Sequence, residues 1–164
     1  MKSIWYISKY VKTSFVGISG SRGFFICNEI SKKGYESIIF SAYPYNYSKK
    51  FNKPISKISN NFEYVYLKSY ESKIQNSFKR IFSWLDFERK LFFFNKSKIS
   101  KPDVIIVSSL SILTLLNGLY LKRRYNCKLI FEIRDIWPLS AIEFGGFDEK
   151  NIFIKLLKLL EYIG

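Results

Sequence analysis

The chain has 164 residues, of which 27 are Lys or Arg, 13 are Asp or Glu and none is His, so its formal charge is +14. This length fits one domain, and a hydrophobic content of 48% is enough for a core. Without His, nucleophilic triads and zinc sites that use imidazole are excluded. Cys27 and Cys127 lie too far apart for a metal knuckle or a disulfide framework, which favours a reducing compartment.

The basic charge comes with an aromatic content of 19%. This combination favours three kinds of partner: nucleic acid, an anionic membrane or a phosphorylated substrate. A low-GC genome, which enriches Lys, Ile, Asn, Phe and Tyr, is an alternative source of part of the bias. No RNA- or DNA-binding motif is present, so nucleic acid is the least favoured partner. The N-terminal sequence lacks the features of a secretory signal, and we expect none.

The first part of the chain has the pattern of a strand, a loop, a helix and a second strand. Residues 3–8 form a short apolar run, and residues 9–21 are rich in Gly, Ser and Thr. A helix is predicted from Arg22 to the sequence Lys32-Lys33-Gly34, because basic residues followed by glycine suit a helix C-terminus. Residues 36–42 complete a βαβ unit, which predicts parallel strands joined by a right-handed crossover.

The rest of the chain continues this alternation after a long basic loop predicted at residues 43–61. Further strands are expected at 62–68, 103–109 and 128–133, and further helices at 73–94, 110–124 and 152–163. The pattern predicts an α/β fold with a Rossmann-like, doubly wound, mostly parallel sheet flanked by helices, as one domain over residues 1–164. The uncharged run 104–121 is also compatible with a membrane span, but its Ser-rich middle favours a strand followed by a helix.

The first candidate site is the glycine-bearing loop that precedes the first helix. Its predicted phosphate-binding or acceptor-binding residues are Gly17, Gly20, Ser21, Arg22 and Gly23. Glycines let backbone N–H groups approach a phosphate, the helix N-terminus attracts anions, and Arg22 can bind a phosphate or carboxylate through two N–H groups. The spacing matches neither a P-loop nor a dinucleotide fingerprint, and the alternative is an ordinary surface loop.

The second candidate site is the sequence Glu132-Ile133-Arg134-Asp135-Ile136-Trp137-Pro138, where charged residues follow a predicted strand. Ligands of open α/β sheets bind beyond the carboxyl ends of the strands. Asp135 is therefore a candidate general base toward a hydroxyl, with Arg134 holding its charge and Trp137 lining the ligand site. The alternative is a structural ion pair of Arg134 and Asp135, with Trp137 in the core.

The helix predicted at 73–94 has two apolar faces. The face that we assign to the core carries Ile74, Phe78, Ile81, Leu85 and Phe92. The face that we assign to a membrane interface or to a further domain carries Trp84, Phe87, Leu91 and Phe94. Together with Lys79 and Arg80, Trp84 and Phe87 are predicted to contact an anionic membrane. The alternative is a helix buried in the α/β core.

Several segments carry a family resemblance. They are Gly20-Ser21-Arg22, the helix end Ser31-Lys32-Lys33-Gly34-Tyr35-Glu36, the strand Pro102-Asp103-Val104-Ile105, and the sequence Glu132-Ile133-Arg134-Asp135-Ile136-Trp137-Pro138-Leu139-Ser140. The last is similar to the Arg-Asp-Leu-Trp-Pro-Glu-Ser stretch of enzymes that build O-antigen, capsule and exopolysaccharide. Nearly the whole chain resembles the N-terminal, acceptor-binding domain of bacterial family 4 glycosyltransferases of the GT-B type. Tyr35 and Ser37 replace the family's His and Val, and the Pro-rich start of its glycine loop is absent.

The resemblance implies the acceptor-binding half of a membrane-associated enzyme that moves a sugar from a nucleotide-sugar donor to a lipid-linked saccharide. It implies surface polysaccharide synthesis at the cytoplasmic face of the plasma membrane, with no metal and no cofactor besides the donor. The family's donor-binding domain has no counterpart here. We therefore expect a fragment, a truncated frame or half of a two-chain enzyme, inactive without a separate donor-binding chain. The alternative is a non-catalytic membrane-docking subunit that recruits a catalytic chain.

Overall fold

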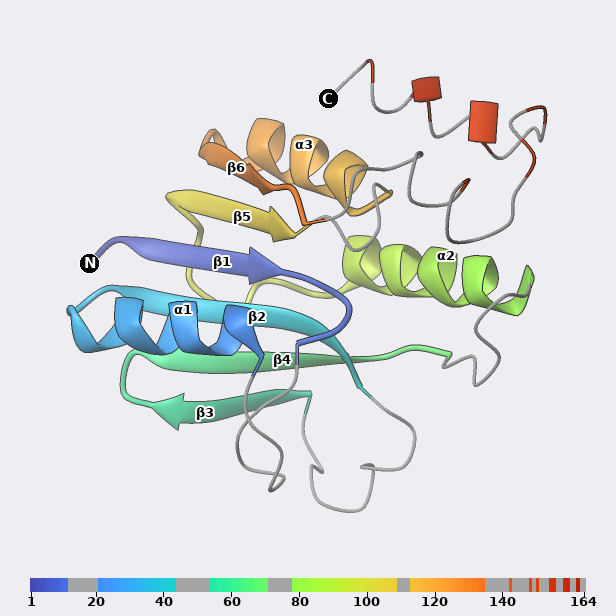
Figure 1. Cartoon of the computed structure of the whole chain (residues 1–164). Coiled ribbons are helices and arrows are strands. Elements are labelled where there is room, and N and C mark those ends of the chain that lie inside the picture. The colour runs from blue at the N-terminus through green and yellow to red at the C-terminus, as the bar shows by residue number, and fades with distance from the viewer. Residues whose placement is uncertain are drawn as a thin grey trace.

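The computed structural model describes residues 1–11, 21–43, 54–70, 78–108 and 113–134, and a few residues between 142 and 162. It shows an α/β fold whose described part is a six-stranded, mostly parallel sheet flanked by three helices (Figure 1), which confirms the predicted fold class. The strands are β1 (Ser3–Ile7), β2 (Glu36–Tyr43), β3 (Ile55–Ser59), β4 (Phe62–Lys68), β5 (Val104–Ser108) and β6 (Lys128–Glu132). The helices are α1 (Arg22–Lys32), α2 (Phe78–Phe93) and α3 (Leu113–Tyr125).

The strand order is β3-β4-β2-β1-β5-β6, and every pairing except that of β3 with β4 is parallel. From β1 the chain builds the sheet outward through β2 and β4, and it then returns to the other side of β1 to add β5 and β6. The strand order therefore reverses between β1 and β5. In open α/β sheets, the crevice at the carboxyl ends of the strands at such a reversal is where ligands bind.

Alternate residues of β1 enter two different cores, one on each face of the sheet. Trp5 and Ile7 pack with residues of α2 and α3, including Phe87 and Leu121. Tyr6 points to the other face and packs with residues of α1, including Phe24 and Cys27. The three-layer arrangement follows, because a strand buried on both faces needs a helix layer on each side.

The predicted end of α1 is confirmed in detail. Gly34 has a φ angle of +84°, in the left-handed region that favours glycine, and its N–H donates to the Ser31 carbonyl over 3.0 Å. Lys32 occupies the last turn, where a cation suits the helix dipole.

Strand β3 lies inside the segment that we predicted as a loop, and this part of the prediction is wrong. β3 runs antiparallel to β4 at the edge of the sheet. Its residues are at most partly buried. Its sequence, Ile-Ser-Lys-Ile-Ser, does not alternate apolar and polar residues, so it lacks the pattern that marks a strand. Residues 44–53 of the predicted loop lie outside the described residues.

The two faces of α2 are the reverse of our assignment. Trp84 and Phe87 are 6% and 1% exposed, and Leu91 is fully buried, whereas Leu85 and Phe92 are 49% and 43% exposed. Both faces are apolar, so periodicity alone cannot tell which one packs on the sheet. The deciding factor is the large Trp5, Phe40 and Val65 surface of the sheet, which Phe87 and Leu91 cover.

The uncharged run 104–121 is divided between β5 and α3, as its composition favoured. Among the described helices, none has the length and apolar character needed to cross a bilayer.

Candidate functional site

An ion pair joins the two candidate sites. Arg22 is the first residue of α1 and Glu132 is the last residue of β6, and Arg22 Nε lies 2.7 Å from Glu132 Oε1. The sequence placed these residues in separate motifs, and the fold brings the motifs together beside the reversal of strand order. The sequence motif contains Glu132, but the motif alone assigns no role to it. The sequence feature that marks it is a carboxylate at the end of the apolar run of a strand.

The phenol of Tyr6 forms the third part of this cluster. Its hydroxyl donates a hydrogen bond of 2.6 Å to Glu132 Oε2, so Arg22 and Tyr6 hold the two oxygens of one carboxylate. Burial, and then the hydrogen bond to Glu132, raise the pKa of Tyr6 well above its usual range, against smaller opposite effects of Ser108 and Arg134. Tyr6 is therefore a neutral donor at ordinary pH.

The cluster presents a cation at the carboxyl edge of the sheet. The side chain of Arg22 is 69% exposed, whereas that of Glu132 is 14% exposed. An ion pair with one solvated partner adds little to stability. Its main consequence is to fix the guanidinium at the start of α1, where the helix dipole also attracts anions. A phosphate or carboxylate is the chemistry that this arrangement can bind.

Gly23 is explained by the close approach of α1 to β1. A Cβ atom at Gly23 would lie 2.3 Å from Cε1 of Tyr6, so any side chain here would collide with the ring. Ser21, the N-cap, is extended, and its carbonyl accepts the N–H groups of Phe24 and Phe25. The packing accounts for Gly23, and phosphate binding by Ser21 and Gly23 stays a prediction.

The remaining candidates of the two motifs are only partly visible. Gly17, Gly20, Asp135 and Trp137 lie outside the described residues, so the role of Asp135 as a general base stays a prediction. Arg134 is exposed two positions beyond β6, and its charge acts on the phenol of Tyr6.

The predicted membrane residues of α2 are separated by the fold. Lys79 is exposed, while the side chain of Arg80 lies outside the described part. Trp84 and Phe87 are buried, and their assignment to a membrane surface is wrong. The indole N–H of Trp84 donates to the hydroxyl of Tyr10 over 3.0 Å, which ties this side of α2 to the end of β1.

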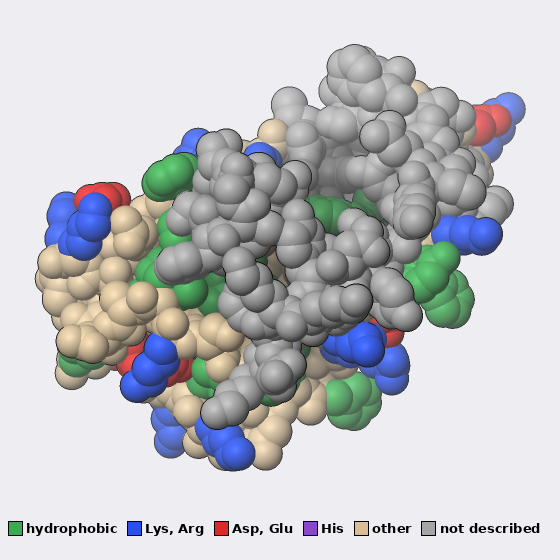
Figure 2. All heavy atoms as spheres, turned by 90° about the horizontal axis from the view of Figure 1, so that it is seen from below, with side chains coloured by type: hydrophobic (Ala, Val, Ile, Leu, Met, Phe, Trp, Pro, Cys, Tyr) green, Lys and Arg blue, Asp and Glu red, His purple; other side chains and the backbone are tan. Residues whose placement is uncertain are grey.

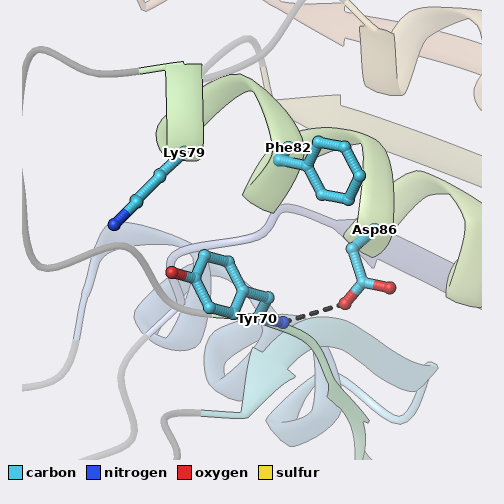
Figure 3. A pocket seen from close by; sticks show the side chains of 4 residues that line it. All are labelled: Tyr70, Lys79, Phe82 and Asp86. Carbon is cyan, nitrogen blue, oxygen red and sulfur yellow. Dashed lines mark hydrogen bonds between the residues drawn. The ribbon is translucent and has the colours of Figure 1, made fainter.

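A hollow of about 500 Å³ lies beside the start of α2 and was not predicted (Figure 3). Tyr70, Lys79, Phe82 and Asp86 line it, and the backbone N–H of Tyr70 donates to Asp86 Oδ2 over 2.8 Å. Partial burial alone would raise the pKa of Asp86, but the bonds from Tyr70, Arg89 and Lys90 outweigh it and hold the pKa below its usual value. The hollow thus combines an aromatic wall, a cation and a charged carboxylate.

A buried polar network lies behind this hollow. Lys9 donates to Ser83, which donates to the carbonyl of Tyr70. Glu88 accepts hydrogen bonds from Thr114 over 2.5 Å and from Asn117 over 2.6 Å, and so it joins α2 to α3.

Burial raises the pKa of Glu88 to about 7, although Thr114, Asn117 and the charge of Lys9 favour its ionised form. The sequence signal that we missed is a carboxylate placed between Phe87 and Leu91 on an otherwise apolar face.

On the face that Figure 2 shows, the described Lys and Arg side chains lie in several separate groups. Among the described residues, no group of His, Cys, Asp and Glu could hold a metal ion. Neither protein-family models nor curated proteins match the chain. The interpretation of the site therefore depends on its own geometry and on the resemblance of its motifs.

Proposed function

We propose that the chain is the acceptor-binding half of a membrane-associated glycosyltransferase. Its acceptor would be a lipid-linked saccharide, and the sugar would come from a nucleotide-sugar held by a separate donor-binding domain or chain. The product would enter surface polysaccharide synthesis at the inner face of the plasma membrane. The activity needs no cofactor besides the donor.

The observation that carries this proposal is the Arg22–Glu132 ion pair at the reversal of strand order. The Glu132–Ser140 motif has the most specific family resemblance and the glycine loop also resembles the family, and the pair brings their described ends into contact. A solvent-exposed guanidinium at a helix N-terminus matches the diphosphate of a prenyl-linked acceptor in charge and geometry. Asp135 follows the same strand end and is the proposed base for the acceptor hydroxyl.

The hollow beside α2 supports an amphipathic acceptor. Phe82 is 71% exposed and Leu85 is 49% exposed on the outer face of α2, and Lys79 lies one turn before Phe82. Apolar side chains next to a cation suit the boundary between headgroups and acyl chains of an anionic membrane. In this proposal, Phe82 and Leu85 take the role that the sequence assigned to Trp84 and Phe87.

A binding experiment tests the proposal without requiring transfer. The protein is titrated with a water-soluble, short-chain prenyl diphosphate that carries a sugar. We expect saturable binding that Arg22→Gln weakens roughly tenfold or more, the range for one charge-assisted contact.

Lys32→Gln is the matched control, because Lys32 is also an exposed cation paired with a carboxylate, Glu29, but lies at the other end of α1. Equal loss in both variants, or no binding by the unaltered protein, would contradict the proposal.

A further inference from the structure

A second hollow lies at the edge of the sheet opposite the Arg22–Glu132 pair. Its walls come from the end of α2, the following loop and the last turns of α3, and its volume is about 500 Å³. The loop leads into β5, where the Asp103 N–H bonds to Ser3 and its carbonyl bonds to Lys128, so this is the amino edge of the strands. The volume lies within the usual range for small-molecule sites.

The charges that line this hollow are all positive. They belong to Lys96, Lys101 and Arg124, and none of the lining residues that the structure describes carries a carboxylate. The Lys96 ammonium is held by the carbonyls of Leu91, Phe92 and Phe94 at 2.5, 3.2 and 3.0 Å. These three bonds hold its charge in place within the lining of the hollow.

Lys96 has no carboxylate partner among the described residues that line the hollow. Burial, and then the charge of Arg124, lower the pKa of Lys96 to about 8. The carbonyl oxygens around it supply dipoles but no net charge. An anion in the hollow would stabilise the charged ammonium and raise this pKa.

Most of the other lining residues are aromatic. The rings of Phe92 and Tyr120 lie 4.8 Å apart, and the guanidinium of Arg124 lies 5.9 Å from the ring of Tyr125. Arg124 Nη1 also donates to the hydroxyl of Tyr120 over 2.8 Å, which positions the cation beside both tyrosines. Aromatic rings and positive charges therefore line the same hollow.

We propose that this hollow is a second binding site, for a small organic anion that combines a planar ring with a phosphate or carboxylate. The ring packs against Tyr120 and Phe92, and the anionic group meets Lys101 and Arg124 above the fixed charge of Lys96. A bare ring leaves the cations uncompensated, and a bare anion leaves the aromatic walls in water. The site is independent of the proposed acceptor site, because the two lie at opposite edges of the sheet.

The test uses three probes: phenyl phosphate, inorganic phosphate and phenol. Binding is followed by NMR, through the Lys96 side-chain and Tyr120 ring signals. We expect phenyl phosphate to bind at least tenfold more tightly than either other probe, and to raise the pKa of Lys96. Tyr120→Ala and Lys101→Gln should each weaken its binding several-fold.

Two control variants change the same residue types outside the hollow. Phe25→Ala removes an exposed ring on α1, and Lys122→Gln removes an exposed cation from the last turn of α3; neither should alter binding.

Equal affinity for phenyl phosphate and phosphate, or equal effects of the controls, would overturn the proposal. It would also be overturned if phenyl phosphate did not bind while vesicles of anionic lipid did so through Tyr120 and Lys101. Concentration-dependent dimerisation through these residues, without phenyl phosphate binding, would likewise overturn it.

Discussion

Arg22 and Tyr6 each contact a different carboxylate oxygen of Glu132. Arg22 lies at the start of α1, and Tyr6 lies in β1. The carboxylate is thereby contacted by a charged guanidinium that faces solvent, through an ion pair, and by a buried neutral hydroxyl that donates a hydrogen bond. Its two contacts have different energetic roles. We expect the buried contact with Tyr6 to contribute to stability, and the exposed contact with Arg22 to contribute little.

Glu132→Ala should lower the free energy of unfolding by about 1–3 kcal/mol, because it leaves the hydroxyl of Tyr6 without its acceptor. Chemical denaturation measures the change. Glu132→Gln keeps an acceptor oxygen, so it should lower the free energy of unfolding by less than Glu132→Ala. Tyr6→Phe in the Glu132→Ala background should recover part of the loss, since the orphaned hydroxyl is gone. If the double variant is no more stable than Glu132→Ala, the hydrogen bond does not carry the effect.

Gly23→Ala should destabilise the fold by about 1–3 kcal/mol through overpacking against the ring of Tyr6. Tyr6→Leu should relieve part of this loss, because the shorter side chain leaves room for a methyl group. Gly34→Ala is the comparison: no atom lies within 4 Å of a Cβ there, and its loss comes from the positive φ angle. The Tyr6 change should therefore not rescue Gly34→Ala. Thermal denaturation of Gly23→Ala, Gly34→Ala, Tyr6→Leu and the two double variants that contain Tyr6→Leu separates steric from conformational strain.

The sequence predicted those features that local signals determine. The helix end at Lys32-Lys33-Gly34 and the strand at Val104-Ile105-Ile106-Val107 have strong composition signals, and the structure confirms both. The edge strand β3 and the buried face of α2 could not be predicted, because each depends on contacts with distant parts of the chain. β3 pairs with β4, and the buried face of α2 packs on side chains of the sheet.

The same holds for the candidate site. A sequence shows that Arg22 and Glu132 are charged, but only the parallel pairing of β1, β5 and β6 brings them into contact. The buried Glu88 could be suspected from its apolar neighbours, whereas its partners Thr114 and Asn117 come from another helix.

Glu88 should make stability fall as the pH rises from about 4.5 to about 7. In this window the folded protein keeps a proton on Glu88, whose pKa burial raises from 4.5 to about 7, while the unfolded chain has lost it. The stabilisation by protonated Glu88 should be complete below pH 4.5 and absent above about pH 7. Its upper limit is about 3 kcal/mol. Urea unfolding at pH 5 and pH 8 measures it.

Glu88→Gln is the variant that isolates this contribution, because glutamine resembles the protonated acid in shape and charge. It should match the unaltered protein at pH 5 and be more stable at pH 8. Asp86→Asn is the control, since the pKa of Asp86 is held below its usual value and its titration lies at lower pH. A pH dependence that survives Glu88→Gln unchanged would show that another group causes it.

The two faces of α2 should separate stability from membrane binding. Trp84 is buried and hydrogen-bonded to Tyr10, so Trp84→Ala should destabilise the fold by about 3–5 kcal/mol. Phe82 is 71% exposed, and Phe82→Ala should change stability by no more than about 0.5 kcal/mol. If Phe82 enters the headgroup layer, its loss should weaken binding to anionic vesicles roughly tenfold, the equivalent of burying one aromatic side chain.

Flotation with anionic and neutral vesicles, at low and high salt, measures this binding. Phe25→Ala is the matched control, because Phe25 is 52% exposed but lies on α1, on the opposite face of the sheet. Binding should require anionic lipid and decrease with salt, since Lys and Arg near such a surface contribute about 1 kcal/mol each and are screened. Equal losses for Phe82→Ala and Phe25→Ala would mean that charge alone attracts the protein. A loss only in Trp84→Ala would mean that binding follows the folded fraction rather than a surface of α2.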